Sequence, residues 1–295
     1  MLDADTTSAP SAAQDLELIA DAARQARWLA MNYFGRDPRV WNKENNSPVT
    51  EADMALDDYL GRELRGARPG YGWLSEETTD NKEWLSHGRL FLVDPIDGTR
   101  AFIRGEEDWM VSVAVVEARR PIAAALYAPV VEDLYVATIG DGARLNGFLI
   151  AVNERSALAG VHVAGPRSLR EREALLEAGI NQEQPIRSLA LCIALVAAGR
   201  RDAAIATARS HDWDLAAADL LVQEAGGQLT DLDGRALRYN RSDVRHPALI
   251  ASSQVLRSAL EAIVRNALEV EDTEPRASRV ADCGAGLQAY AIQAR

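Results

Sequence analysis

The sequence predicts an α/β fold of mixed α+β character, in which helices alternate with strands. Two observations support this prediction. Apolar residues recur at helical spacing in several segments, beginning with residues 15–34. Valine-rich segments such as 110–117 are typical of strands, and the short turns near them predict antiparallel meanders in a mixed sheet. A chain of 295 residues can form one large domain or two smaller ones that share an interface.

Composition and charge limit the class of protein. Hydrophobic residues make up 47% of the chain and charged residues 26%, as in ordinary soluble globular proteins. The formal net charge of −12 argues against a protein that coats nucleic acid, which needs a basic face. No stretch is long and apolar enough to span a membrane, and residues 1–6 lack the pattern of a signal peptide. Cys192 and Cys283 make no disulfide framework, so we expect a cytoplasmic protein.

In the N-terminal part, residues 1–14 are small and polar and predict a disordered leader. Gly35 and Pro38 end the first helix, and a linking segment at 40–46 carries Lys43. A second amphipathic helix begins at Thr50 or Ser47, and its expected core face is Met54, Leu56, Tyr59, Leu60 and Leu64. The other elements expected here are strands at 73–74, 90–93, 110–117, 121–127 and 133–138, with a polar surface loop at 81–88.

The C-terminal part is expected to alternate strands and helices. The predicted strands are 161–163, 203–206, 229–232 and 249–252, and the predicted helices are 168–178, 189–199, 215–225 and 259–268. We therefore divide the chain into an N-terminal α+β part at 15–152, a C-terminal α/β part at 153–268 and a disordered tail at 269–295.

The most informative segment is Val-Asp-Pro-Ile-Asp-Gly-Thr at 93–99. A buried strand delivers Asp94 and Asp97 into a turn, and apolar sequence then resumes, so Gly98 and Thr99 are expected to open a helix. Free N–H groups at a helix start suit a phosphate, and glycine allows close approach. Two carboxylates repel a phosphate unless a hard cation such as Mg²⁺ lies between them. The segment indicates a metal and phosphate site, although an ordinary acidic turn can have the same composition.

Three further motifs accompany this segment, at 49–53, 75–78 and 211–217. Each contains a carboxylate with a simpler explanation. Asp53 can complement the dipole of its helix, Glu76 can be solvated, and Asp214 can cap the helix that follows. A cap needs no tryptophan before it, however, and the small residues at 216–218 suit a helix packed close to a neighbour. These features favour a functional role for Asp214.

In this order, the four motifs resemble those of the inositol monophosphatase superfamily, the magnesium-dependent, lithium-sensitive phosphatases. The superfamily includes inositol monophosphatases, 3'(2'),5'-bisphosphate nucleotidases, fructose-1,6-bisphosphatases and some histidinol phosphatases. The resemblance extends from about Leu16 to about Ile263. It implies a sugar-phosphatase-like layered α-β-α-β-α sandwich and a hydrolase of phosphoric monoesters.

The resemblance also implies a site. The implied metal ligands are the side chains of Glu76, Asp94, Asp97 and Asp214 and the carbonyl of Ile96, which would hold two or three Mg²⁺ ions. The implied catalytic residues are Asp53, Thr99 and Glu76, with in-line attack of a metal-bound water on the phosphate. The implied substrate contacts are Gly98, Thr99, Asp97, Asp214 and Arg209. Lys43 is either a charge partner near the metals or an ordinary surface lysine.

The expected partner is a small phosphorylated metabolite, with neither a membrane nor nucleic acid, and a homodimer is the expected assembly. Inositol-preferring relatives usually carry a glutamate shortly before Trp-Asp, and residues 206–210 contain none. Residues 97–108 look more like the bisphosphate nucleotidase branch, which would convert adenosine 3',5'-bisphosphate to AMP. Such nucleotidases often have a lysine near the position of Cys192, and this sequence departs from that pattern. Inositol 1-phosphate and histidinol phosphate are the alternative substrates.

Two other functions remain open. Haloacid-dehalogenase-type phosphatases also contain Asp-Gly-Thr after a strand, but their nucleophilic aspartate lies two residues before the second aspartate. Asp94 and Asp97 are three residues apart and do not match those roles. A regulator associated with RNA or polymerase, without catalysis, is less consistent with a complete set of acidic residues.

Overall fold

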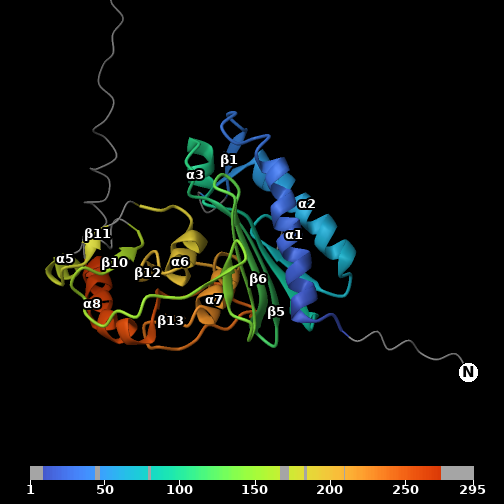
Figure 1. Ribbon diagram of the computed structural model, residues 1–295. Coiled ribbons are helices and arrows are strands. Elements are labelled where there is room, and N and C mark those ends of the chain that lie inside the picture. The colour runs from blue at the N-terminus through green and yellow to red at the C-terminus, as the bar shows by residue number, and fades with distance from the viewer. Residues whose placement is uncertain are drawn as a thin grey trace, which may run out of the picture.

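Helical layers and β-sheets alternate through the structure, so that each sheet is covered on both faces (Figure 1). This computed structural model describes residues 9–43, 47–78, 81–166, 173–182, 185–208 and 210–273. Within them, the layers are α1 with α2, a seven-stranded sheet, α6 with α7, a five-stranded sheet, and α5 with α8. The predicted mixed α/β fold with a layered α-β-α-β-α sandwich is confirmed.

The larger sheet is a meander that begins with one parallel pair. Its strands lie in the order β3 (Gly72–Ser75), β4 (Arg89–Asp97), β5 (Met110–Glu117), β6 (Arg120–Ala128), β7 (Asp133–Thr138), β8 (Ala143–Leu145) and β9 (Phe148–Ile150). β3 runs parallel to β4, and each pair from β4 to β9 is antiparallel. Ala118 and Arg119 have φ of 48° and 65°, as a two-residue hairpin turn between β5 and β6 requires. The mixed sheet expected from the sequence is therefore present.

Side-chain alternation along β4 sends successive residues to two different cores. Phe91 and Val93 pack with α1 (Ala12–Ala30) and α2 (Glu51–Ala67) on one face of the sheet. Leu90 and Leu92 pack on the other face, toward α6 and α7. Because both faces are covered, β4 is apolar at successive positions until it reaches Asp94. The same alternation places Asp94 on the face of α7.

Helix α7 (Asp212–Glu224) lies between the two sheets and is buried on all sides. Its buried residues include Leu215, Ala216, Ala217, Ala218, Leu220, Leu221 and Val222. A helix that is apolar over most of its circumference belongs in the interior, and its small residues allow close approach of α6 (Leu189–Ala197) and the larger sheet. The sequence 215–222 therefore explains why this helix forms the central layer.

The smaller sheet covers the opposite side of α6 and α7. Its strands lie in the order β11 (Asn181–Gln182), β10 (His162–Ala164), β12 (Ala203–Ala206), β14 (Leu249–Ser252) and β13 (Gln228–Asp231). Ala204 and Ala251 face the central helices, whereas Ile205 and Ile250 face α5 (Glu173–Glu177) and α8 (Gln254–Thr273). Among the described residues, no helix combines the length and apolar composition that a membrane span requires.

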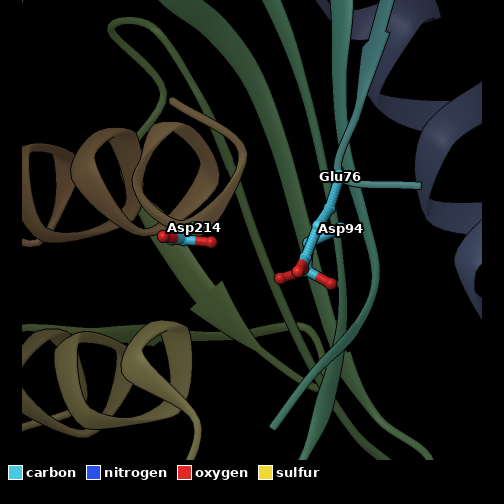
Figure 2. A group of neighbouring side chains, drawn as sticks. All are labelled: Glu76, Asp94 and Asp214. Atoms are coloured by element: carbon cyan, nitrogen blue, oxygen red, sulfur yellow. The ribbon is translucent and has the colours of Figure 1, made fainter. Parts of the chain in front are cut away.

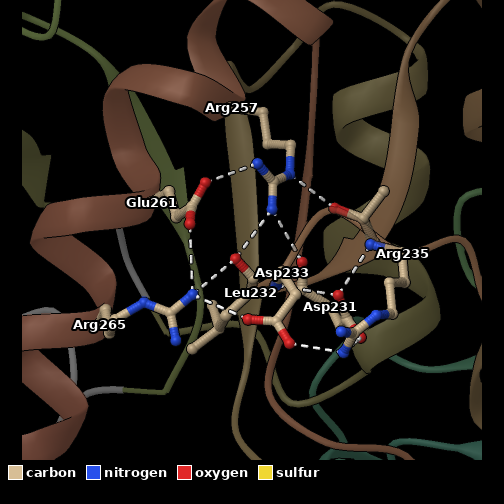
Figure 3. Close-up of polar contacts among 8 residues, drawn as sticks. Asp231, Leu232, Asp233, Arg235, Arg257, Glu261 and Arg265 are labelled. Carbon is tan, nitrogen blue, oxygen red and sulfur yellow. Dashed lines mark hydrogen bonds and ion pairs between the residues drawn. The ribbon is translucent and has the colours of Figure 1, made fainter.

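Arginine side chains attach α8 to the end of β13 (Figure 3). Arg257, 8% exposed, donates from Nε to Thr230 Oγ1 at 2.8 Å and from Nη2 to the carbonyls of Asp231 and Leu232, both at 3.0 Å. It also pairs with Glu261 at 2.9 Å. Carbonyls and a carboxylate together satisfy the guanidinium, so its burial is compensated.

Several predicted boundaries were wrong by a few residues. α1 begins at Ala12, inside the predicted leader, because Ser11 and Gln14 form a capping box, and it ends at Ala30 rather than near Phe34. α8 runs from Gln254 to Thr273 and includes the start of the predicted tail. Residues 1–8 and 274–295 lie outside the described residues, as do residues 168–172 of the helix predicted at 168–178.

Two segments predicted as irregular contain structure. Within the linking segment, β1 (Val40–Asn42) pairs with β2 (Pro48–Thr50) in an antiparallel hairpin. Within the predicted surface loop, a 3₁₀ turn η1 (Glu83–Ser86) buries Trp84 to 2% exposure. By contrast, Met54, predicted in the core face of α2, is 37% exposed. The two adjacent apolar residues Trp84 and Leu85 in a polar stretch show no periodicity, so the sequence pattern missed the burial of Trp84.

A buried carboxylate in the middle of α7 links this helix to a distant loop. Asp219 is fully buried and accepts hydrogen bonds from Gln223 Nε2 at 2.6 Å and Tyr239 Oη at 2.9 Å. Burial raises the pKa of Asp219 to about 6, although both hydrogen bonds oppose the rise. The folded state thus prefers the protonated form. This contribution to stability is fully present below the pKa of the unfolded chain and is lost as the pH rises through 6.

Replacing Asp219 with asparagine should make stability less dependent on pH. The difference in free energy of unfolding, Asp219→Asn minus wild type, should rise by on the order of 2 kcal/mol from about pH 4 to about pH 7.5. Urea denaturation at a series of pH values measures it. Asp58→Asn, at an exposed position of α2, is the matched control. A difference that stays constant across this range would contradict the prediction.

Candidate active site

The parallel pair β3 and β4 brings the first two carboxylates together. Parallel strands end at the same edge of a sheet, so the residue after β3 lies beside the end of β4. The N–H of Glu76 donates to the carbonyl of Val93 at 3.1 Å, which aligns Glu76 with the neighbouring Asp94. Asp94 is 2% exposed. The sheet topology therefore explains how Glu76 and Asp94, 18 positions apart, share one site.

The start of α7 supplies a third carboxylate. In β5, Ser112 lies opposite Asp94, and its hydroxyl donates to the carbonyl of Trp213 at 3.3 Å. Asp214 is the third residue of α7, and its Oδ2 accepts the N–H of the N-cap residue His211 at 2.7 Å. The helix begins three residues earlier than predicted, so Asp214 is the N3 residue of a capping box rather than the N-cap itself. Ser112 anchors this turn beside Asp94.

Glu76, Asp94 and Asp214 form one group, in which one carboxylate oxygen from each lies within 4.8 Å of the others. Figure 2 shows Glu76 and Asp94 together at the sheet, with Asp214 facing them from the helix. Burial, followed by repulsion from Glu76, Asp97 and Asp214, raises the pKa of Asp94 well above its usual value. Clustered carboxylate oxygens are the donors that Mg²⁺ prefers, and a cation would relieve their repulsion. The group therefore fits a divalent cation.

Asp97 lies outside this group, because the N-terminus of α6 holds its carboxylate. Ser188 Oγ and the N–H of Ala190 each donate to Asp97 Oδ2 at 2.6 Å. Burial and then repulsion from Asp214 raise the pKa of Asp97 to about 7, against these two hydrogen bonds. The turn predicted after the strand is a bulged end of β4, since the register shifts between Asp94 and Asp97. The predicted helix start at Gly98 and Thr99 is confirmed, with α3 at Thr99–Arg104.

Gly98 marks the turn from β4 into α3. Its φ is +103°, and a Cβ there would lie 2.8 Å from the carbonyl oxygen of Asp108. Only glycine avoids both the backbone strain and this clash. The turn can therefore pass close to the α3–β5 loop and still present Thr99 to the site.

Thr99 joins Asp53 at the same end of the sheet. Its hydroxyl lies 3.3 Å from Asp53 Oδ1 and 3.1 Å from the carbonyl oxygen of Ile96. Asp53 also belongs to a capping box, because its Oδ2 accepts hydrogen bonds from the N–H and hydroxyl of Thr50. Burial raises the pKa of Asp53 to about 6, although the bonds from Thr50 oppose this. Asp53 thus caps its helix and also contacts a residue at the centre of the site.

Lys43 reaches the site from the β1–β2 hairpin that the sequence did not predict. Its Nζ lies 2.9 Å from Glu76 Oε1 and 2.7 Å from Glu77 Oε1. Burial lowers the pKa of Lys43, but attraction to Glu76 and hydrogen bonds to both glutamates give a net rise. Burial and repulsion from Glu76 raise the pKa of Glu77 to about 7. The lysine is therefore a charge partner of the site rather than a free surface residue.

Sequence reasoning missed the residues that hold the carboxylates in place. Ser112 and Ser188 lie in apolar segments, and their contacts to Trp213 and Asp97 span 101 and 91 positions. A lone serine within a buried strand was the only signal for Ser112. Of the predicted substrate contacts, Arg209 lies outside the described residues.

The chain is similar to known phosphatases along most of its length. The model of the inositol monophosphatase family matches residues 12–270. An inositol-1-monophosphatase from Mesorhizobium japonicum is 31% identical over 86% of this chain and 97% of its own length. A histidinol-phosphatase from Mycobacterium tuberculosis is 34% identical over 82% and 97%. A 3'(2'),5'-bisphosphate nucleotidase from Aggregatibacter actinomycetemcomitans is 30% identical over 77% and 88%.

Solved structures agree with the sequence comparison. The inositol monophosphatase of Thermotoga maritima superposes with a TM-score of 0.78 at 27% identity. The match covers 87% of this chain and 98% of that protein. The likeness therefore includes both sheets and the helices between them.

The repulsion in the carboxylate group predicts how Mg²⁺ affects stability. A raised carboxylate pKa means that stability is lost as the pH rises through it, so the ionised group destabilises the metal-free fold at neutral pH. Asp94→Asn should raise the melting temperature in EDTA, because it removes one charge while its amide oxygen can still accept the N–H of Ile96. Mg²⁺ should raise the melting temperature of the wild type and raise that of the variant much less.

Thermal unfolding followed by circular dichroism, with and without Mg²⁺, tests this prediction. The control is Asp58→Asn, which removes one exposed carboxylate outside the group and should respond to Mg²⁺ like the wild type. An equal rise in Asp94→Asn and wild type would exclude Asp94 as a metal ligand.

Proposed function

The chain belongs to the inositol monophosphatase family, and from this premise we propose that its carboxylate group binds Mg²⁺ for the hydrolysis of a small phosphomonoester. Phosphatases of this family are metal-dependent hydrolases of phosphomonoesters. The observation that carries the proposal is the convergence of Glu76, Asp94 and Asp214 from three elements within 4.8 Å. Three ionised groups so close together are costly in a folded protein unless a cation accompanies them.

The proposed ligands are Glu76, Asp94, Asp97, Asp214 and the carbonyl of Ile96. Bound Mg²⁺ would supply positive charge that offsets the phosphate and makes water more acidic at neutral pH. The carbonyl oxygen of Ile96 lies 3.1 Å from the Thr99 hydroxyl, and Asp97 accepts hydrogen bonds at the N-terminus of α6. These contacts support the proposal, because they orient the oxygens that would bind the metal. Two or three ions and a homodimer remain our expectations from the family resemblance.

Asp53 and Thr99 are the proposed groups for water activation. The Thr99 hydroxyl can donate to Asp53 Oδ1 while its lone pair accepts from a water. A carboxylate with a pKa of about 6 is suited to receive a proton near neutral pH. Water then attacks phosphorus, the bond to the ester oxygen breaks, and the leaving alcohol takes up a proton. Glu76 lies within the same cluster and is the third proposed catalytic residue.

The phosphate itself is proposed to bind at the turn of residues 98–99. Among the described residues, no acceptor is found for the N–H groups of Gly98 and Thr99. Free N–H groups at this turn can donate to phosphate oxygens without breaking an existing bond. Gly98 has no side chain that could obstruct the approach.

For the leaving group we propose a nucleoside phosphate, with adenosine 3',5'-bisphosphate converted to AMP. Residues 206–210 carry no glutamate before Trp213, where inositol-preferring relatives usually have one for the sugar hydroxyls. The nucleotidase of Aggregatibacter supports this choice, although inositol monophosphatase and histidinol-phosphatase relatives of similar identity support the two alternatives equally.

Removing the Thr99 hydroxyl should slow the chemical step more than it weakens binding. We expect Thr99→Ala to lower kcat on the order of 10²–10⁴-fold with little change in KM, since positioned proton transfer is worth that much. Thr99→Ser keeps the hydroxyl and should recover most of the activity. Steady-state phosphate release measures both variants. A loss confined to KM would assign Thr99 to substrate binding instead.

A substrate panel tests the proposed function. Phosphate release is measured with Mg²⁺ and with EDTA for adenosine 3',5'-bisphosphate, inositol 1-phosphate, fructose 1,6-bisphosphate and histidinol phosphate. We expect hydrolysis only with Mg²⁺ and the highest kcat/KM for the bisphosphate nucleotide. A higher value for inositol 1-phosphate or histidinol phosphate would replace the substrate assignment. Hydrolysis of none of them, or equal hydrolysis in EDTA, would overturn the metal-dependent mechanism for these substrates.

A further inference from the structure

A cavity of about 340 Å³ opens beside the carboxylate group, between α6 and β12. Asp214 lines it, so the cavity borders the proposed metal site. The volume is within the range of pockets that bind small molecules. If the metal site acts on a phosphomonoester, as proposed above, the alcohol part of that substrate would lie in this cavity.

The lining of the cavity is mostly apolar with a single positive charge. The apolar residues that line it are Pro166, Ile186, Leu189, Ile205, Ala206 and Ala208. Among the described lining residues, Arg187 is the one cation and Asp214 the one anion. An alcohol with many hydroxyl groups would find few partners on such walls. A leaving group with an apolar body and one anionic group matches them better.

A hydrogen bond holds the backbone of Arg187 just before the N-terminus of α6. Its N–H donates to Asp108 Oδ2 at 2.6 Å, and the next residue, Ser188, is the N-cap of α6. Ser188 is in turn bonded to Asp97. Arg187 is thereby fixed relative to the carboxylates of the site through only one intervening residue. The backbone from which the guanidinium extends is therefore anchored beside the cavity, which lowers the cost of ordering Arg187 on a ligand.

The guanidinium of Arg187 has room for a ligand beside its present partner, Glu106. Nε donates to Glu106 Oε2 at 2.7 Å, and the side chains are 31% and 42% exposed. Within the described part of the chain, its two terminal nitrogens make no hydrogen bond or ion pair. A partly exposed ion pair of this kind contributes little stability, whereas two terminal N–H groups can bind a phosphate in bidentate fashion. A ligand can therefore replace or join Glu106 at small cost.

A buried hydroxyl without a hydrogen-bond partner among the described residues also lines this cavity. Ser210 Oγ is buried and has no hydrogen-bond partner among the described residues. A buried hydroxyl without a partner costs free energy, which a bound ligand can recover. Ser210 lies four residues before Asp214 in the sequence and lines the same cavity as Arg187. Ser210 and Arg187 thus offer two polar contacts to one ligand.

We propose that Arg187 is the specificity residue for a second phosphate on the leaving group. The site is otherwise rich in negative charge, with Asp97, Asp214, Glu106 and Asp108 all near Arg187 or the cavity. A second phosphate would be repelled there without a cation of its own. Cys192 lines the same cavity but is uncharged, so Arg187 is the residue that can supply the positive charge.

The test compares two substrates that differ only in the second phosphate, adenosine 3',5'-bisphosphate and adenosine 3'-phosphate. The readout is the ratio of their kcat/KM values with Mg²⁺. We expect the wild type to favour the bisphosphate, and Arg187→Gln to reduce the ratio about 10- to 100-fold, mainly through KM. Arg187→Lys keeps the charge without the planar fork and should give an intermediate ratio.

Arg104→Gln is the matched control, because Arg104 also lies near Glu106, at 3.9 Å, but does not line the cavity. It should keep the wild-type ratio. An unchanged ratio in Arg187→Gln, with both substrates losing equally, would overturn the proposal and leave Arg187 a structural role. A wild type that hydrolyses phosphomonoesters without preferring the bisphosphate would also overturn it, while the phosphatase function stands. A wild type inactive on the whole panel would refute the proposed function instead.

Discussion

The structure depends on holding several carboxylates of like charge next to one another in the protein interior. Asp94 is almost completely buried, and Glu76 and Asp214 face it within 4.8 Å. Such a group opposes folding when it is ionised and has no cation. The chain tolerates it by giving each carboxylate a donor, as the N–H of Ile96 does for Asp94, the N–H of His211 for Asp214 and the ammonium of Lys43 for Glu76. The layered fold supplies these donors where β3 and β4 end and where α6 and α7 begin.

The five layers explain why that place exists. β3 and β4 are parallel and end at one edge, α7 begins there, and α6 begins beside it. Helix N-termini present unpaired N–H groups, which stabilise negative charge. The apolar central layer keeps α7 between the two sheets, so its first turn cannot move away from Asp94. Packing of residues without any chemical role therefore positions those that have one.

Much of this arrangement could be predicted from the sequence. The strand before Asp94, the helix start at Gly98 and the helix after Asp214 all follow from local patterns, and the order of the motifs identified the family. Local patterns could not reveal Trp84 in a polar segment or the β1–β2 hairpin that brings Lys43 to Glu76. Three-residue strands carry almost no periodic signal, and they form here because tertiary contacts complete them.

The sequence by itself determined which residues carry charge, roughly where most of the longer helices and strands lie, and which turn needs a glycine, because these are properties of a few neighbouring residues. Only the tertiary structure decided which carboxylates meet. Asp97 lies three positions from Asp94 and its carboxylate is held by donors of α6, whereas the group that Asp94 forms includes Asp214, 120 positions away. It also decided that Arg187 and Asp214 line one cavity. Contacts of this kind depend on how sheets and helices pack, and sequence separation carries no record of that packing.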